Sequence, residues 1–167
     1  MLFRSVKEWI SGKEDGVCRK LIIGKEYILR EVEAPAGYLR AEDIHFTINE
    51  NGKVVIKEKV QDTNTITMVD KPQEIELGKV DADDTSVYVA GAELEVRVAS
   101  GDTYTGKEKL ATTILGDTLE WTSETTATKF AGIRPGTYWL VETAAPSGYT
   151  LAQPVKFTVE AGEESSG

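Results

Sequence analysis

A glutamate stands at the same place in two copies of one phrase, Glu31 within residues 27–38 and Glu142 within residues 138–149. Both copies read Tyr-x-Leu-x-Glu-x-x-Ala-Pro-x-Gly-Tyr. Because side chains alternate between the two faces of a strand, each glutamate continues the face that carries the tyrosine and the leucine. A lone charge on an apolar face is costly to bury, so each carboxylate is expected either at the rim or beside a specific partner.

Two further strand-like stretches carry a charged residue on an apolar face. In residues 74–79 the face with the aliphatic side chains continues to Lys79, and in residues 63–70 it continues to Asp70. Taken one at a time, such residues are typical of exposed strand ends. Taken together, a lysine, an aspartate and a glutamate are the residue types needed to form an amide bond between two side chains.

The repeated phrase belongs to a longer internal repeat. The residues Trp9 and Trp121 also correspond, with one residue of slippage, which extends the match toward the N-terminus. A fixed offset over this length indicates two copies of one domain type. Six pairs share an offset of 111 positions: Tyr27 and Tyr138, Glu31 and Glu142, Pro35 and Pro146, Tyr38 and Tyr149, Ala41 and Ala152, and Phe46 and Phe157.

The remaining pattern is one of short strands between Gly- and Pro-rich turns. No stretch has helical periodicity over ten or more residues, so the sequence predicts an all-β chain of two antiparallel β-sandwich modules. We expect modules at residues 1–73 and 74–167, the second ending in a polar, disordered tail at 161–167. Strands are predicted at residues 3–10, 17–23, 27–31, 43–49, 53–60, 63–70, 74–80, 92–98, 119–122, 128–131, 138–142 and 154–159.

Composition limits the possible partners and compartments. The 167 residues carry a net charge of -9, which argues against nucleic-acid binding, and no run is long enough to span a membrane. Cys18 is the single cysteine, so no intrachain disulfide can form. His45 is the single histidine and is expected to be a surface strand residue. We find no signal peptide, no sortase-type sorting motif, and no residue set that predicts a metal or a cofactor.

The phrase resembles the E-box of CnaB-type domains, also called SpaA or prealbumin-like domains, which are stalk modules of Gram-positive pilins and surface adhesins. Residues 78–81 and 90–94 resemble the first two strands of that family, and residues 67–70 resemble its last strand. The resemblance implies Ig-like or prealbumin-like sandwiches on an extracellular, cell-wall-anchored parent protein. It also implies an isopeptide bond from a first-strand lysine (Lys79) to a last-strand Asp or Asn (Asp70), assisted by the E-box glutamates Glu31 and Glu142.

The chemistry of such a bond is consistent with these residue types. Desolvation disfavours charged forms, so a buried lysine amine becomes neutral and nucleophilic while a buried carboxyl retains its proton. The amine attacks the carboxyl carbon, a glutamate transfers protons, and one water leaves. Strand pairing holds the reacting atoms together, which supplies the effective concentration.

Neither copy contains a complete set. At the 111-residue offset, the first-copy equivalent of Lys79 would lie before Met1, and the second-copy equivalent of Asp70 would lie beyond Gly167. We therefore expect the first module to lack its N-terminal strand or strands, the second to lack its C-terminal strand, and the chain to be a fragment of a longer stalk. The resemblance implies that first and last strands run parallel, and parallel neighbours need a long crossover, so a direct Asp70–Lys79 bond within one chain is not expected. The Asp70 strand of one molecule could instead complete the module of another molecule that contains Lys79 and Glu142, and so cross-link two chains.

The residues support three other functions less well. Adhesive binding to a host protein or glycan could use Trp9, Trp121 or Trp139, although core packing is the simpler role for each tryptophan. Residues 81–84 contain three aspartates but lack the glycine and distal glutamate of a calcium loop, which favours a solvated turn. A conventional enzyme is not expected, because no cleft can be argued around the acidic pairs. The predicted partners are neighbouring domains of the same surface protein and other copies of the chain.

Overall fold

The computed structural model describes residues 4–164, and these residues form two compact units. Unit 1 comprises residues 4–30 and 43–68, and unit 2 comprises residues 31–42 and 69–164. All of the regular structure in the described residues is β-strand, as the sequence predicts. Within the same residues, no helix is long and apolar enough to cross a membrane.

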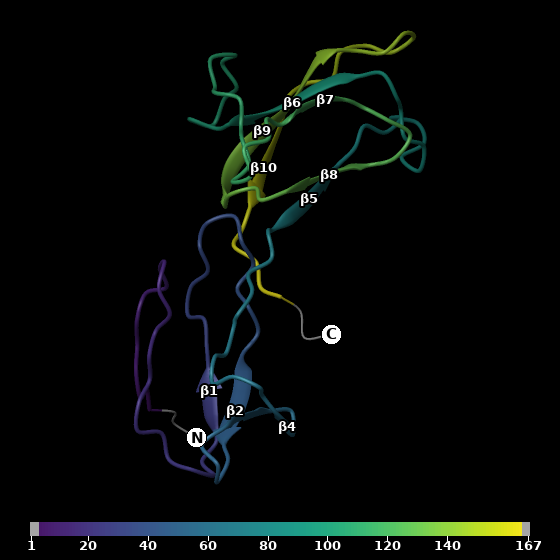
Figure 1. Ribbon diagram of the computed structural model, residues 1–167. Helices are drawn as coiled ribbons and strands as arrows, with labels where there is room; N and C mark the ends of the chain where they lie inside the picture. Colours follow the sequence, from purple (N-terminus) through teal and green to yellow (C-terminus); the bar gives the residue numbers. More distant parts are fainter. Residues whose placement is uncertain (1–3, 165–167) are drawn as a thin grey trace. The chain divides into compact units, whose positions relative to one another are not determined.

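Unit 1 is built on one antiparallel sheet with the strand order β1-β2-β3-β4 (Figure 1). Its strands are β1 (Tyr27–Leu29), β2 (Ile44–Ile48), β3 (Val54–Ile56) and β4 (Lys59–Val60). Residues 53–60 were predicted as a single strand, but the chain reverses at Lys57 and Glu58, which both have positive φ. A two-residue turn of this kind usually contains Asn or Gly, so the Lys-Glu sequence gave no signal for it.

Unit 2 contains two sheets (Figure 1). The larger sheet has the order β10-β9-β6-β7, and the smaller one pairs β5 with β8. Every strand pair in both sheets is antiparallel, which confirms the predicted fold class. The bounds are β5 (Glu74–Leu77), β6 (Glu93–Val98), β7 (Glu120–Thr122), β8 (Thr128–Ala131), β9 (Gly136–Ala144) and β10 (Val155–Val159).

The hydrophobic core of unit 2 lies between its two sheets. Alternation along each strand directs one set of side chains inward, as in a β-sandwich. The side chains of Ile75 and Leu77 from β5 and Phe130 from β8 pack against residues of the larger sheet. The buried core residues are Val96, Ala111, Leu119, Ile133, Tyr138 and Val159.

The internal repeat extends to the pairing register. In unit 1, Tyr27 pairs with Phe46, and in unit 2 Tyr138 pairs with Phe157, so both pairs keep the offset of 111. The rings stack in both places, with centroids 5.7 Å and 5.6 Å apart and the same interplanar angle of 27°. The strand pair β1–β2 is therefore the structural copy of β9–β10.

Several predicted strands do not form regular ladders. Residues 4–10, 17–23 and 63–70 contain no strand, and residue 3 lies outside the described range. The alternation of burial in residues 65–70 is nevertheless as predicted, because Ile66, Met68 and Asp70 are half-buried and their neighbours are exposed. The tail also differs from the expectation of disorder: Glu163 forms a parallel bridge with Arg40, while residues 165–167 lie outside the described range.

Candidate functional site: two carboxylate centres in unit 2

Lys79 and Glu142 form an ion pair in unit 2. The Nζ of Lys79 lies 3.6 Å from Oε1 of Glu142, and the two side chains are 20% and 2% exposed. Oε1 of Glu142 is buried and accepts no hydrogen bond, whereas Oε2 accepts one from the backbone N–H of Ala152 at 2.6 Å. A buried carboxylate needs such partners, because its desolvation is otherwise costly.

The strands of both sheets position this pair. Glu142 lies in β9 opposite Leu94 of β6, at the middle of the larger sheet. Lys79 follows β5 on the face of its two apolar residues, and its carbonyl accepts a hydrogen bond from Val89 N–H at 2.8 Å. Strand pairing fixes the backbone at Glu142, and this hydrogen bond fixes the backbone at Lys79. The amine and the carboxylate therefore meet from the two different sheets.

The first copy of the phrase forms a second centre, also in unit 2, around Glu31 and Asp70. Oε2 of Glu31 accepts a hydrogen bond from Ala41 N–H at 2.8 Å, which repeats the Glu142–Ala152 contact at the same offset. The carboxyl groups of Asp70 and Glu31 share a hydrogen bond. Burial raises the pKa of Asp70, and the negative charges of Glu31 and Glu164 raise this pKa further.

The two centres thus contain different parts of the predicted set. Lys79 lies with Glu142, and Asp70 lies with Glu31. Within residues 4–164, no ion pair or hydrogen bond joins Asp70 to Lys79. The roles of these four residues in forming an isopeptide bond remain predictions.

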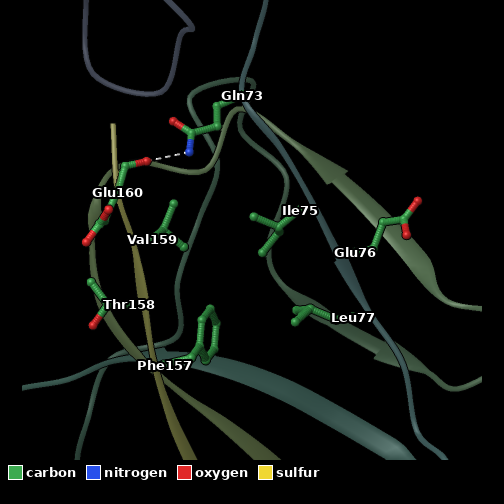
Figure 2. A pocket seen from close by; sticks show the side chains of 8 residues that line it. All are labelled: Gln73, Ile75, Glu76, Leu77, Phe157, Thr158, Val159 and Glu160. Atoms are coloured by element: carbon green, nitrogen blue, oxygen red, sulfur yellow. Dashed lines mark hydrogen bonds between the residues drawn. The ribbon is translucent and has the colours of Figure 1, made fainter. Parts of the chain in front are cut away.

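A groove lies between β5 and β10, both of which are sheet edges (Figure 2). It has a volume of about 380 Å³. Figure 2 shows Ile75 and Leu77 on one wall and Phe157 and Val159 on the other, while Glu76 points away. The groove therefore has four apolar side chains among polar ones, and it is bounded by two strands that have no second neighbour among the described residues.

Sequence reasoning missed the charged residues around Asp70. Glu164 lies near Asp70, and its Oε1 is 3.6 Å from Nζ of Lys71. Oε1 of Glu163 is 2.6 Å from Nη2 of Arg40. Residues 161–167 were expected to form a disordered tail, so no contact was predicted for these glutamates. No sequence pattern links them to Arg40 and Lys71, which lie far away along the chain.

The other residues singled out from the sequence lie outside these centres. His45 is an exposed residue of β2, as predicted, and its Nδ1 lies 2.9 Å from Glu26 Oε1. Trp139 is buried and Trp121 is half-buried, whereas Trp9 is 47% exposed. Among the described residues, no group of three or more His, Cys, Asp or Glu side chains is placed to hold a metal ion.

Comparison with known proteins identifies the family. The family of the SpaA prealbumin-like fold domain matches residues 3–64 and 73–166, which is most of the chain. The chain belongs to the SpaA family. The match comes in two segments, one for each copy of the repeat.

Two solved pilin structures are similar to this chain. A streptococcal ancillary pilin is 25% identical, with a TM-score of 0.42, and the match covers 83% of this chain and 39% of the pilin. BcpA, the major pilin subunit of Bacillus cereus, is 21% identical, with a TM-score of 0.41, and the match covers 77% and 36%. This chain thus spans less than two fifths of the length of each pilin chain. No curated protein sequence matches it.

The raised pKa of Asp70 makes the stability of unit 2 depend on pH. A folded state that raises an aspartate pKa binds the proton more tightly than the unfolded chain does. The contribution of Asp70 to the free energy of unfolding is therefore largest below its ordinary pKa and is lost as the pH rises through the raised value. Asp70→Asn cannot ionise, so this variant is expected to gain stability relative to the wild type between about pH 3 and about pH 7. Thermal unfolding of both proteins across that range measures the difference.

Other carboxylates are common to both proteins, so their contributions to the pH dependence of stability cancel in the comparison. Asp62→Asn, at an exposed position in unit 1, serves as the matched control. A constant difference between Asp70→Asn and wild type over the whole range would contradict the prediction.

Proposed function

We propose that the chain is a structural stalk or spacer segment of a Gram-positive cell-surface pilin or adhesin, rigidified by a Lys-to-Asp or Lys-to-Asn isopeptide bond. Membership of the SpaA family supports this proposal. The observation that carries it is the Lys79–Glu142 pair, in which a largely buried amine lies 3.6 Å from a carboxylate that is 2% exposed. A structural amide formed once requires no turnover, so the chain would not act as an enzyme on a substrate.

In the proposed reaction, Nζ of Lys79 attacks the side-chain carbonyl carbon of an Asp or Asn. A C–N bond forms, and the bond to the leaving oxygen or nitrogen breaks. Glu142 first takes one proton from the Lys79 ammonium to give the nucleophilic amine. As the amide forms, Nζ loses a second proton; one of the two passes from Glu142 to the leaving group, which departs as water from Asp or ammonia from Asn, and the other stays on Glu142. The product is a neutral amide, which relieves the desolvation cost of the ion pair.

The groove between β5 and β10 supplies a place for the strand that would carry this Asp or Asn. Its walls offer two open strand edges and four apolar side chains (Figure 2). An extended strand lying parallel to β5 would place apolar residues in the groove at alternate positions and its next inward residue beside Lys79.

Residues 66–70 have the required pattern. Ile66, Met68 and Asp70 alternate with exposed residues, and Asp70 already lies beside a glutamate in the first-copy centre. A segment with this sequence is therefore expected to react with Lys79 through the side-chain carboxyl group of its aspartate. Because the two centres hold complementary parts, the same chemistry could join one chain to another.

The experiment supplies this acceptor as a synthetic peptide of residues 63–71. The Asp70→Ala chain is incubated with the peptide, so that no chain can react with the Asp70 of another. The expected product is a one-to-one adduct whose intact mass is the sum of the two masses minus one water. Peptide mapping is expected to place the new bond at Lys79, and the adduct is expected to resist boiling in detergent.

Two controls decide the result. The same peptide with Asp70→Ala, and the chain with Lys79→Arg, should both give no adduct. The tethered strand should also raise the free energy of unfolding of unit 2, because it can bind the groove only in the folded state. The proposal fails if no adduct forms with the wild-type peptide, or if the adduct also forms with the Lys79→Arg chain.

A further inference from the structure

The loop between β9 and β10, residues 145–154, carries the hydrogen-bond donor of Glu142. Ala152 N–H donates to Oε2 of Glu142 at 2.6 Å, and no other hydrogen bond to this carboxylate is present within residues 4–164. Residues 147–151 of the loop are exposed, and Tyr149 N–H closes a turn by donating to Pro146 O at 3.1 Å. An exposed loop needs further contacts if it is to hold a donor in a fixed place.

The side chain of Tyr149 supplies such a contact. Its hydroxyl group donates a hydrogen bond to Oδ2 of Asp81 at 2.8 Å. Asp81 is itself held, because its N–H donates to Val87 O at 3.0 Å and its Oδ1 accepts from Asp83 N–H at 2.8 Å. Asp81 lies two residues after Lys79. One hydrogen bond therefore links the loop that contacts Glu142 to the segment that carries Lys79.

Charge strengthens this hydrogen bond. The Tyr149 hydroxyl lowers the pKa of Asp81, and the Asp81 carboxylate raises the pKa of Tyr149. At neutral pH the donor is therefore protonated and the acceptor is ionised, which makes the bond stronger than one between neutral groups. The Tyr149 side chain is 43% exposed, so core packing does not account for its position.

The first copy of the phrase provides a matched comparison for Tyr149. Tyr38 occupies the same place at the offset of 111, and its N–H closes the same turn by donating to Pro35 O at 3.0 Å. Within residues 4–164, the hydroxyl group of Tyr38 forms no hydrogen bond. Removing that hydroxyl group therefore alters the same residue type without altering the Asp81 contact.

We propose that Tyr149 and Asp81 are positioning residues of the Lys79–Glu142 centre, an inference that rests on the proposed function. The Tyr149–Asp81 hydrogen bond holds the loop so that Ala152 N–H fixes Oε2 of Glu142. Oε1 then remains directed at Nζ of Lys79, at 3.6 Å. Without this bond the amine and the carboxylate would spend less time in the reactive arrangement, and the reaction would slow.

The kinetic experiment uses the Asp70→Ala chain and the 63–71 peptide at increasing concentration. Tyr149→Phe is expected to lower the maximal rate of capture by about tenfold, because it disturbs the geometry of the reacting pair. The peptide concentration at half the maximal rate should stay within about twofold, since Tyr149 does not line the groove that binds the peptide. Tyr38→Phe, the matched control, should change neither quantity.

A double-mutant cycle tests whether the two residues act together. Asp81→Asn keeps an Oδ1 that can accept the Asp83 N–H but removes the negative charge that Tyr149 contacts. It should slow capture in the chain that has Tyr149 and cause no further loss in the Tyr149→Phe chain. Losses that simply add would show that the two side chains act separately and would reject the proposal.

Hydrogen exchange examines the centre without any peptide. In the chain alone, Tyr149→Phe should speed exchange of the Ala152 amide by about tenfold, because its contact with Glu142 opens more often. The Val96 amide, which donates to Leu119 O in the core, should exchange at the wild-type rate. An equal increase at both amides would indicate general loss of stability and would contradict a positioning role.

These measurements separate the proposal from the proposed function. If the Asp70→Ala chain with Tyr149 intact captures no peptide, the isopeptide function is rejected, and Ala152 exchange alone decides whether Tyr149 positions Glu142. Unchanged Ala152 exchange in Tyr149→Phe overturns the proposal whether or not capture occurs. If capture does occur, a wild-type maximal rate in Tyr149→Phe, or a change confined to the half-saturating concentration, also overturns it.

Discussion

Replacing Glu142 with glutamine is expected to slow capture of the 63–71 peptide by about 10²- to 10⁴-fold, the range for loss of a general acid or base. Glutamine retains an oxygen that can accept the Ala152 N–H, so the local fold should persist. It cannot carry a proton from Nζ of Lys79 to the leaving group. Initial rates from intact-mass time courses, at equal peptide concentration, measure the effect.

The repeat provides a matched control for Glu142→Gln. Glu31 occupies the same place in the other copy of the phrase and accepts the equivalent backbone hydrogen bond from Ala41. Glu31→Gln in the Asp70→Ala chain should leave the capture rate unchanged, because Lys79 pairs with Glu142. Equal rates for wild type and Glu142→Gln would remove Glu142 from the reaction, even if capture at Lys79 itself occurs.

Leu119→Ala is expected to lower the free energy of unfolding of unit 2 by about 2–5 kcal/mol. The Leu119 side chain is fully buried in the core between the two sheets. Removing it loses apolar burial and leaves a cavity that neighbouring strands can fill only in part. Urea unfolding followed by the fluorescence of Trp121 and Trp139 measures the change, in a Trp9→Phe background that removes the unit 1 signal.

Leu151→Ala is the control for Leu119→Ala. Leu151 belongs to the same unit but is 56% exposed, so its truncation should change the free energy of unfolding by less than about 0.5 kcal/mol. The interpretation of the core would be wrong if the two variants lost similar stability. An unchanged unit 1 in both proteins, monitored through hydrogen exchange of β1 and β2, would locate the effect in unit 2.

Much of the fold follows from residue pattern, because burial imposes alternation. The repeat predicted both β1–β2 and β9–β10, and the structure gives them one register, with Tyr27 on Phe46 and Tyr138 on Phe157. The pattern failed where no partner strand is present. Residues 63–70 have the alternation of a strand but no ladder, since hydrogen bonding to a neighbour, which sequence does not reveal, decides whether a strand forms.

The alternation of buried and exposed residues also predicted part of the candidate site. The phrase and the apolar faces singled out Glu142 and Lys79, which do lie together, and Glu31 and Asp70, which also do. The tail was not predictable. Glu163 and Glu164 read as a polar terminus, and their contacts with Arg40 and Lys71 depend on tertiary structure alone.

The discontinuity of unit 2 has a consequence for how the protein can form during synthesis. Residues 31–42 leave the ribosome long before residues 160–164, yet Arg40 N–H donates to Gly162 O and Glu164 N–H donates to Arg40 O. Gln73 and Glu160, 87 residues apart, are joined by a hydrogen bond. Contacts of such long range close slowly, because loop-closure entropy must be overcome before they form. Unit 2 therefore cannot be completed until almost the last residue described here has been made, and Glu31 and Asp70 remain without Glu164 until then.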